Sequence, residues 1–196
     1  HMVYISTDYV FSGIKDRYTE VDEPDPVGFY AITKFEGEKR VLKLGDNGLV
    51  VRIANPYGPK ESGKKDFVHK IAEDLKKGSF IKAPSDQLFI PTFIPDIAAS
   101  LKLLVYKNAH GIYHVVGNEA LSPYQAAKEI ARRIGISDDA VQATSFASYF
   151  KGQPLNKTAY KDKQVLLVGG LGFIGTTLAH RLVDMATCSQ WDRPSS

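Results

Sequence analysis

Four glycines lie close together in the segment VGGLGFIG, and their spacing is typical of a turn that binds a pyrophosphate. Gly170, Gly172 and Gly175 follow the pattern GxGxxG, and Gly169 stands directly before them. Such glycines let the backbone approach a phosphate closely, while the N–H groups and the dipole at the start of the following helix favour its negative charge. A tight turn without a ligand is the alternative interpretation.

The sequence on both sides of this turn favours the ligand. Residues 165–168 have the pattern of a buried strand and residues 176–183 that of a helix, which is the context in which the glycine pattern binds dinucleotides. The acidic residue that would bind the adenosine ribose is expected about 20 residues later, and neither Asp184 nor Asp192 suits that place. The sequence therefore predicts NADP or NAD without deciding between them. The predicted contacts are Gly169, Gly170, Gly172, Phe173, Ile174 and Gly175.

A second group of reactive residues stands at the other end of the chain. Tyr30 and Lys34 are four residues apart in YAITK, so that a helix would place both side chains on one face. Upstream, Ser6 and Thr7 bring two hydroxyl groups to the end of a short apolar strand. Each feature alone has a plain structural explanation: a half-buried aromatic ring, a solvated lysine, and hydroxyls that satisfy the end of a strand.

Composition and charge narrow the classes of function. The chain has 196 residues, of which 43% are hydrophobic, and its net charge of +3 comes from 25 basic and 22 acidic residues that are interspersed. This balance argues against nucleic-acid binding, and no apolar run reaches the roughly 18 residues that a membrane span requires. The single cysteine, Cys188, fits a reducing compartment. We expect a cytoplasmic protein that acts on a small molecule. The histidines lack the spacing of metal ligands, and we predict no metal site.

Apolar runs alternate with helical patterns along the chain. The runs at residues 3–6, 49–55 and 111–117 are continuous, as is typical of strands buried on both faces of a parallel sheet. Helices are predicted at residues 33–44, 66–77, 95–107 and 122–135, the last with a capping box of Ser122 and Gln125. We therefore predict an α/β fold with a largely parallel sheet.

The order of these motifs resembles the short-chain dehydrogenase/reductase superfamily, in particular its extended, sugar-nucleotide-modifying branch. The similarity is greatest to dTDP-4-dehydrorhamnose reductases, and it extends over nearly all of residues 3–163. The segments that carry it, in the family's order, are STDYVFSG, YTEVDEPDPVGFYAITKFEGE, VVRIANPYGP, DQLFIPTFIPDIA, GIYHVVGNEALSPYQAAKEIA and QPLNKTAYKDK. The resemblance implies a Rossmann-like sheet with a small substrate lobe.

The resemblance also implies roles for individual residues. Tyr30 would be the general acid that protonates the substrate carbonyl, Lys34 would lower the pKa of Tyr30 and bind the nicotinamide ribose, and Thr7 with Ser6 would hydrogen-bond the same carbonyl. Substrate contacts would come from Asp8, Tyr9, Asn55 and Tyr57, and cofactor contacts also from Tyr30, Lys34, Asn55 and Pro56.

The motifs do not begin where the family begins. In the family the glycine turn opens the chain, whereas here it follows the substrate lobe, which resembles a circular permutation. No segment corresponds to strands two to four, so the predicted Rossmann-like sheet is incomplete. We divide the chain into a catalytic and substrate-binding part at residues 3–163, a displaced first strand, turn and helix at 164–186, and a tail at 187–196. Either residues 165–168 pair directly with residues 3–6, or a partner chain fills the gap, or that edge of the sheet is open. An open apolar edge would invite pairing with another chain, for instance in a homodimer.

Two classes of function are compatible with this sequence. The first is an NAD(P)-dependent reductase of a nucleotide-linked 4-keto-sugar, favoured by the intact YAITK and STDY segments; epimerase or dehydratase chemistry would use the same tyrosine and lysine. The second is a non-catalytic binding or regulatory protein like the methionine adenosyltransferase beta subunit, which the motifs also resemble. The missing strands favour this second class, or a truncated chain that folds without activity.

Overall fold

We analysed a computed structural model that describes residues 1–15, 17–59, 63 and 65–151. The predicted glycine turn, with Gly169, Gly170, Gly172, Phe173, Ile174 and Gly175, lies outside the described residues. The same holds for the predicted segments 164–186 and 187–196.

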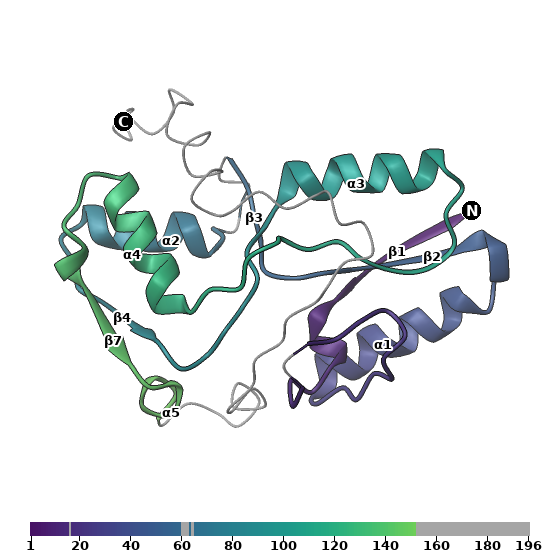
Figure 1. Cartoon of the computed structure of the whole chain (residues 1–196), viewed down its shortest axis with the longest axis horizontal. Coiled ribbons are helices and arrows are strands. Elements are labelled where there is room, and N and C mark those ends of the chain that lie inside the picture. Colours follow the sequence, from purple (N-terminus) through teal and green to yellow (C-terminus); the bar gives the residue numbers. More distant parts are fainter. Residues whose placement is uncertain (16, 60–62, 64, 152–196) are drawn as a thin grey trace.

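A parallel sheet of three strands forms one part of the molecule (Figure 1). Strands β1 (Met2–Thr7), β2 (Gly48–Ile53) and β6 (Gly111–His114) are arranged in the order β1-β2-β6, and both pairs are parallel. Helices α1 (Phe29–Leu42) and α3 (Ile94–Tyr106) lie on opposite sides of the sheet. The predicted α/β fold with a parallel, Rossmann-like sheet is confirmed.

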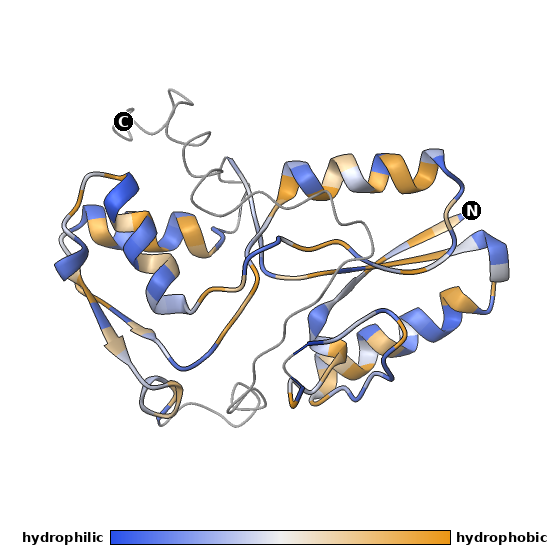
Figure 2. Cartoon of the chain, in the orientation of Figure 1, coloured by the Kyte–Doolittle hydropathy of each residue, from blue (hydrophilic) through white to orange (hydrophobic). Residues whose placement is uncertain are grey.

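The alternation of side chains along β2 explains why both faces are covered. Leu49 and Val51 point to one face, where they pack with Ile97 and Leu104 of α3. Arg52 points to the other face and binds α1. Figure 2 shows more hydrophobic colour along α3 than along α1, in keeping with the apolar cluster that Ile97 and Leu104 of α3 form with the sheet.

Strand β1 differs from the prediction, because it is not buried on both faces. Val3 and Ile5 are each 36% exposed, whereas Leu49, Val50 and Val51 of β2 are fully buried. The physical reason is position: within the described part of the chain, β1 pairs only with β2 and so forms the edge of the sheet. Val3 contributes to an open, apolar groove of about 740 Å³ beside Leu103 and Tyr106 of α3.

A smaller lobe packs around a second core. Helices α2 (Phe67–Lys76) and α4 (Pro123–Arg133) lie against a parallel pair of short strands, β4 (Ile81–Pro84) and β7 (Val141–Thr144), followed by helix α5 (Phe146–Tyr149). Between the sheet and this lobe, strand β3 (Pro56–Tyr57) pairs in parallel with β5 (Thr92–Phe93). Three short 3-10 turns complete the elements of the described residues: η1 (Asp8–Val10), η2 (Gly45–Asn47) and η3 (Asp138–Ala140).

The four predicted helices are confirmed, with one change that matters for the site. Helix α1 begins at Phe29 rather than at residue 33, so Tyr30 lies in its first turn. The capping box of α4 is present, with Ser122 and Gln125 each accepting a hydrogen bond from the other's backbone N–H. Beyond its end, Gly135 adopts a φ of 73°, a left-handed conformation that favours glycine.

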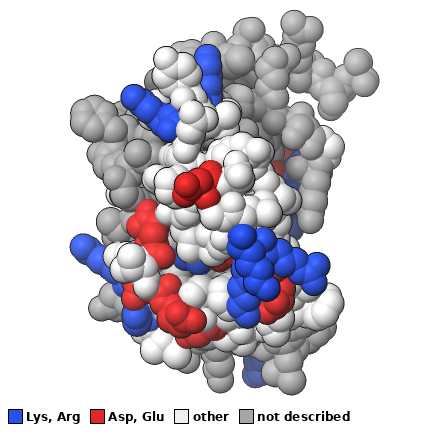
Figure 3. Space-filling view, turned by 90° about the vertical axis from the view of Figure 1, so that its right-hand side faces the viewer, with Lys and Arg blue, Asp and Glu red and all other residues white. Residues whose placement is uncertain are grey.

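The surface carries both signs of charge. Figure 3 looks onto the right-hand end of the view in Figure 1, and acidic and basic side chains lie next to one another there. None of the helices within the described ranges combines the length and the apolar character that crossing a bilayer requires.

A buried ion pair joins α1 to the central strand. Arg52 of β2 donates to both carboxylate oxygens of Glu38, at 3.0 and 2.7 Å, and these side chains are 1% and 0% exposed. The guanidinium group also lies 4.9 Å from the centre of the Phe11 ring, and its Nη1 is 3.3 Å from Nε2 of His114 on β6. The pair therefore links α1, β2 and β6 within the protein interior.

We expect Arg52→Met to destabilise the fold by about 3–5 kcal/mol, because it leaves the Glu38 carboxylate buried without its partner. The double variant Arg52→Met/Glu38→Leu should recover most of that loss, since it removes both charges. Urea denaturation of the three proteins measures the effect. Equal destabilisation in the single and the double variant would contradict this account of the ion pair.

Candidate functional site

The predicted reactive residues meet where β1 ends and α1 begins. Parallel strands present their carboxyl ends at one edge of a sheet, and ligands of open α/β sheets bind outside that edge. Thr7 is the last residue of β1, and η1 follows it at once. Helix α1 packs against both β1 and η1 and starts at this edge (Figure 1).

The turn η1 holds Thr7 and Asp8 in a fixed hydrogen-bonding arrangement. The Thr7 hydroxyl caps the turn by accepting a bond from the Tyr9 N–H at 3.3 Å, and it donates to Oδ1 of Asp8 at 3.0 Å. Asp8 is only 7% exposed. Burial raises the pKa of its carboxyl group to about 6, although bonds from Thr7 and from the N–H groups of Asp8 and Tyr9 act in the opposite direction.

Tyr30 faces this turn from the first turn of α1. Its ring lies 6.0 Å from that of Tyr9 in an edge-to-face arrangement. The side chain is 55% exposed, and its hydroxyl has no hydrogen-bond partner among the residues that the structure describes. The hydroxyl is thus free to meet a ligand.

Lys34 lies one turn further along α1 and is held against β1. Its ammonium group donates to the backbone carbonyl of Ile5 at 2.5 Å and stands 4.4 Å from the centre of the Tyr4 ring. The bond fixes the start of α1 beside the end of β1. It also keeps a positive charge near the edge where β1 ends and α1 begins.

Ser6 is buried at the end of β1, one residue before Thr7. Successive residues of a strand point to opposite faces, so Ser6 and Thr7 diverge. Ser6 is in register with Arg52, is 2% exposed, and its hydroxyl has no hydrogen-bond partner within the described ranges. The register with Arg52 places Ser6 in the interior on the face that α1 covers, whereas Thr7 takes part in the hydrogen bonds of η1.

The predicted contacts from the segment NPYGP are divided between the surface and the core. Asn55 follows β2 with a left-handed φ of 38°, and its carbonyl accepts a bond from the Thr92 N–H. Pro56 is exposed, whereas the Tyr57 ring is buried and packs against Phe67 and Phe93. Asn55 and Pro56 are thus near the carboxyl edge of the sheet, and Tyr57 belongs to the core of the small lobe.

The long loop between η1 and α1 is held in place by two acidic side chains, one bound within the loop and one bound to β6. Asp25 accepts a bond from the Ser12 N–H at 2.6 Å, and Glu20 accepts one from the His114 N–H at 3.0 Å. Tyr18 is buried in this loop and stacks on Phe11. The anchors could not be predicted from the sequence, because the partners of Glu20 and Asp25 are distant in the chain.

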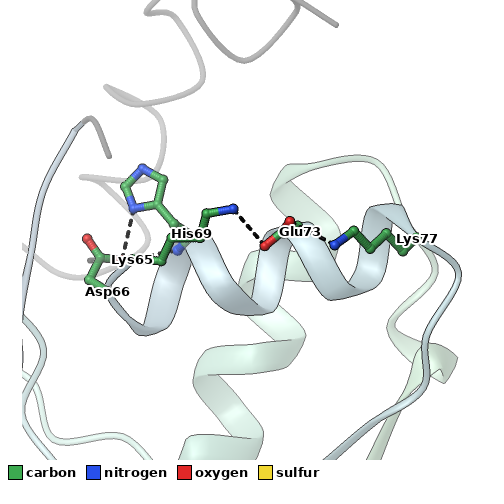
Figure 4. A network of polar contacts seen from close by, with 5 residues as sticks. All are labelled: Lys65, Asp66, His69, Glu73 and Lys77. Atoms are coloured by element: carbon green, nitrogen blue, oxygen red, sulfur yellow. Dashed lines mark hydrogen bonds and ion pairs between the residues drawn. The ribbon is translucent and has the colours of Figure 1, made fainter. Parts of the chain in front are cut away.

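A network of polar contacts lies at the start of α2 and along it (Figure 4). Asp66 caps the helix by accepting from the His69 N–H at 3.0 Å, binds His69 Nδ1 at 2.9 Å, and accepts from the Gly58 N–H at 2.9 Å. Burial works against ionisation of Asp66, but these bonds lower its pKa overall. The network ties the segment after β3 to α2. Within the described ranges no group of three or more His, Cys, Asp or Glu side chains is arranged to hold a metal ion.

Comparison with known proteins identifies a family model and several similar structures. The model of the RmlD substrate binding domain family matches residues 1–159. A crystal structure of dTDP-4-dehydrorhamnose reductase from Bacillus anthracis, in complex with NADP, is similar with a TM-score of 0.80 and 26% identity, covering 95% of this chain and 65% of that one. This confirms the predicted resemblance to these reductases; the circular permutation stays a prediction.

Two curated relatives are similar in sequence. The methionine adenosyltransferase 2 subunit beta of Rattus norvegicus is 36% identical over 137 residues, which are 66% of this chain and 41% of the relative. A "probable low-salt glycan biosynthesis reductase" of Haloferax volcanii is 30% identical over 136 residues, 68% of this chain and 45% of the relative. The chain thus spans less than half the length of both relatives.

The raised pKa of Asp8 predicts a pH-dependent stability. A carboxyl group with a pKa near 6 when folded and 3.8 when unfolded favours the folded state at low pH, and this contribution is lost as the pH rises through about 6. We expect Asp8→Asn to raise the free energy of unfolding at pH 8 by on the order of 2–3 kcal/mol and to change it little at pH 4.

Urea denaturation at the two pH values measures this difference. Asp46→Asn, at an aspartate whose side chain is 93% exposed, is the matched control and should have no comparable effect. An Asp8→Asn variant that is less stable than the wild type at pH 8 would contradict the assignment of a raised pKa to Asp8.

Proposed function

Because the chain belongs to the RmlD substrate binding domain family, we propose that it reduces the keto group of a nucleotide-linked sugar with NADPH or NADH as the hydride donor. The observation that carries this proposal is the meeting of Thr7, Tyr9 and Tyr30 at the carboxyl edge of a parallel sheet. The site combines the exposed phenol of Tyr30, the hydroxyl of Thr7 that caps the turn, and the buried carboxyl group of Asp8. These groups suit a polar ligand with a carbonyl group.

In this proposal Tyr30 is the proton donor. The nicotinamide, when bound, supplies a hydride to the carbonyl carbon, and the Tyr30 hydroxyl gives its proton to the carbonyl oxygen, so that an alcohol forms. The exposed Tyr30 hydroxyl suits this role because it has no competing partner within the described residues. Lys34, one turn further along the same helix, contributes a positive charge beside the reacting groups.

Thr7 and its neighbours orient the substrate. The Thr7 hydroxyl stabilises the charge that develops on the carbonyl oxygen, and Asp8 and Tyr9 line the same turn. Asn55 and Pro56 extend this edge from the neighbouring strand. Tyr57 acts at most indirectly, because its ring is part of the core of the small lobe.

The described residues fit the nicotinamide end of a dinucleotide. Tyr30 and Lys34 leave an exposed hydroxyl and a positive charge at the sheet edge, which suit the ribose beside the nicotinamide. The pyrophosphate contacts would come from Gly169, Gly170, Gly172, Phe173, Ile174 and Gly175, outside the described residues. The related Bacillus anthracis reductase was crystallised with NADP, which supports the same class of cofactor for this chain.

The nucleotide-linked substrate is proposed from relatives. One structural relative is named a dTDP-4-dehydrorhamnose reductase and one curated relative a glycan biosynthesis reductase. Both names describe chemistry on sugars, and a keto group at the sugar C4 fits the roles of Tyr30 and Thr7. We therefore propose a dTDP-linked 4-keto-sugar as the first substrate to test.

A regulatory role is the second candidate. The match to a methionine adenosyltransferase subunit favours it, as does the edge position of β1, which lacks a second neighbour within the described part of the chain. In that case the site would bind a nucleotide or cofactor without turnover, and the chain would act through a partner protein.

Turnover of a dTDP-linked 4-keto-sugar by the full chain, followed by loss of NADPH absorbance, tests the first candidate. We expect Tyr30→Phe to lower kcat by about 10²–10⁴-fold, since the ring remains but the proton donor is lost. Tyr106→Phe, at an 80% exposed tyrosine on α3, is the matched control and should retain the wild-type rate. Equal rates for Tyr30→Phe and the wild type would contradict the catalytic role, and binding of NADPH without turnover would favour the regulatory candidate.

A further inference from the structure

The Thr7 hydroxyl can form only a limited number of hydrogen bonds. A threonine hydroxyl carries one proton and two acceptor lone pairs. In this structure the proton goes to the Asp8 carboxylate, and one lone pair accepts the Tyr9 N–H. What remains is a single lone pair, which can accept a hydrogen bond but cannot donate one.

This arrangement of hydrogen bonds is unfavourable for binding a ketone. A carbonyl oxygen has only lone pairs, so Thr7 must donate to bind it, whereas a sugar hydroxyl can either donate or accept. With an ionised Asp8, the site is complementary to the alcohol and unfavourable for the ketone. The conflict is resolved if Asp8 carries a proton and donates it to the Thr7 oxygen. Thr7 then accepts from Asp8 and from the Tyr9 N–H, and its own proton is available for the carbonyl.

We propose that the proton on Asp8 decides whether the Thr7 hydroxyl can donate to a sugar carbonyl, so that Asp8 is a positioning residue that sets the preference of the site between 4-keto and 4-hydroxy sugars. The inference rests on the proposed function, because it assumes that the sugar's reacting oxygen binds at Thr7. It goes further than that function, because it assigns to Asp8 the relative affinity of the site for the keto substrate and the hydroxy product.

The surroundings of Asp8 permit both protonation states. The carboxyl group is buried at the end of β1, and burial brings its pKa to about 6, so a change of one or two pH units exchanges the two forms. The titratable side chains of this turn and of the first two turns of α1 are Tyr9, Tyr30 and Lys34, whose ammonium is bound to the Ile5 carbonyl above the Tyr4 ring. The other charged residues of α1 are Glu38, paired with Arg52; Glu36, paired with Lys39; and the exposed Arg40.

The proposal makes the affinity for the two sugars differ in pH dependence. We expect the Kd of a dTDP-linked 4-keto-6-deoxyhexose to rise about tenfold between pH 5 and pH 7.5, the effect of roughly one hydrogen bond. The Kd of the corresponding 4-hydroxy sugar should change much less, because Thr7 can serve it in either state. By linkage, the keto-sugar should raise the pKa of Asp8 by about one unit, as the same tenfold coupling requires.

Isothermal titration of the full chain with both sugars, at several pH values, measures these affinities. Asp8→Asn supplies an amide N–H to Thr7 in place of the acid proton, and it should bind the keto-sugar at pH 7.5 as tightly as the wild type does at pH 5. Thr7→Val removes the hydroxyl but keeps the shape; it should abolish the pH step, and adding Asp8→Asn to it should change nothing further. The ¹³C resonance of the Asp8 carboxyl reports its titration directly.

The outcomes separate this proposal from the proposed function. A pH step for the keto-sugar that survives in Asp8→Asn or in Thr7→Val would overturn the role of Asp8 while leaving sugar binding in place. An equal step for both sugars would do the same, because it would show a general effect of pH on the nucleotide. If neither sugar binds to the wild type at any pH, the proposed function itself fails, and this proposal with it.

Discussion

The ion pair of Arg52 and Glu38 is the interaction on which the rest of the site depends. Two charges that are fully buried must remain paired, because an unpaired buried charge costs several kcal/mol. The bidentate geometry leaves α1 little freedom to slide or rotate against β2. Since Tyr30 and Lys34 stand on the same helix, this interior contact fixes their distance from the end of β1 together with the bond of Lys34 to the Ile5 carbonyl.

The direction of the strands explains why the reactive groups meet. β1 and β2 are parallel, so the residues that follow them, Asp8 and Asn55, emerge at one edge. The helix after β1 runs back along the sheet and therefore starts at that same edge with Tyr30. Hydrogen bonds at the edge then set which atoms are available: the Lys34 ammonium is bound to β1, the Thr7 proton is bound to Asp8, and the Tyr30 hydroxyl remains open.

Much of this could be predicted from sequence, because it depends on local patterns. The helix of residues 123–133 was predicted from its capping box, and the strand of residues 48–53 from a continuous apolar run. The short strands β4 and β7 escaped prediction, since four residues carry little periodicity. Pairings between distant residues could not be predicted for another reason. Nothing near Glu38 in the chain indicates that Arg52 will bind it, and nothing near Glu20 indicates that it will accept a bond from the His114 N–H. The exposed face of β1 follows from its place in the sheet, which the apolar sequence VYI does not reveal.

The central claim is that this chain holds a nicotinamide cofactor beside Tyr30 and Lys34. Titration of the full chain with NADPH and with NADH, followed by nicotinamide fluorescence, tests it most directly. We expect saturable binding of at least one cofactor that is weakened by Lys34→Met, at the predicted ribose contact, and abolished by Gly172→Asp, which would place a carboxylate against the pyrophosphate. Absence of binding by both cofactors would contradict the claim, and Tyr30 and Lys34 would then be a proton-transfer pair without a hydride donor.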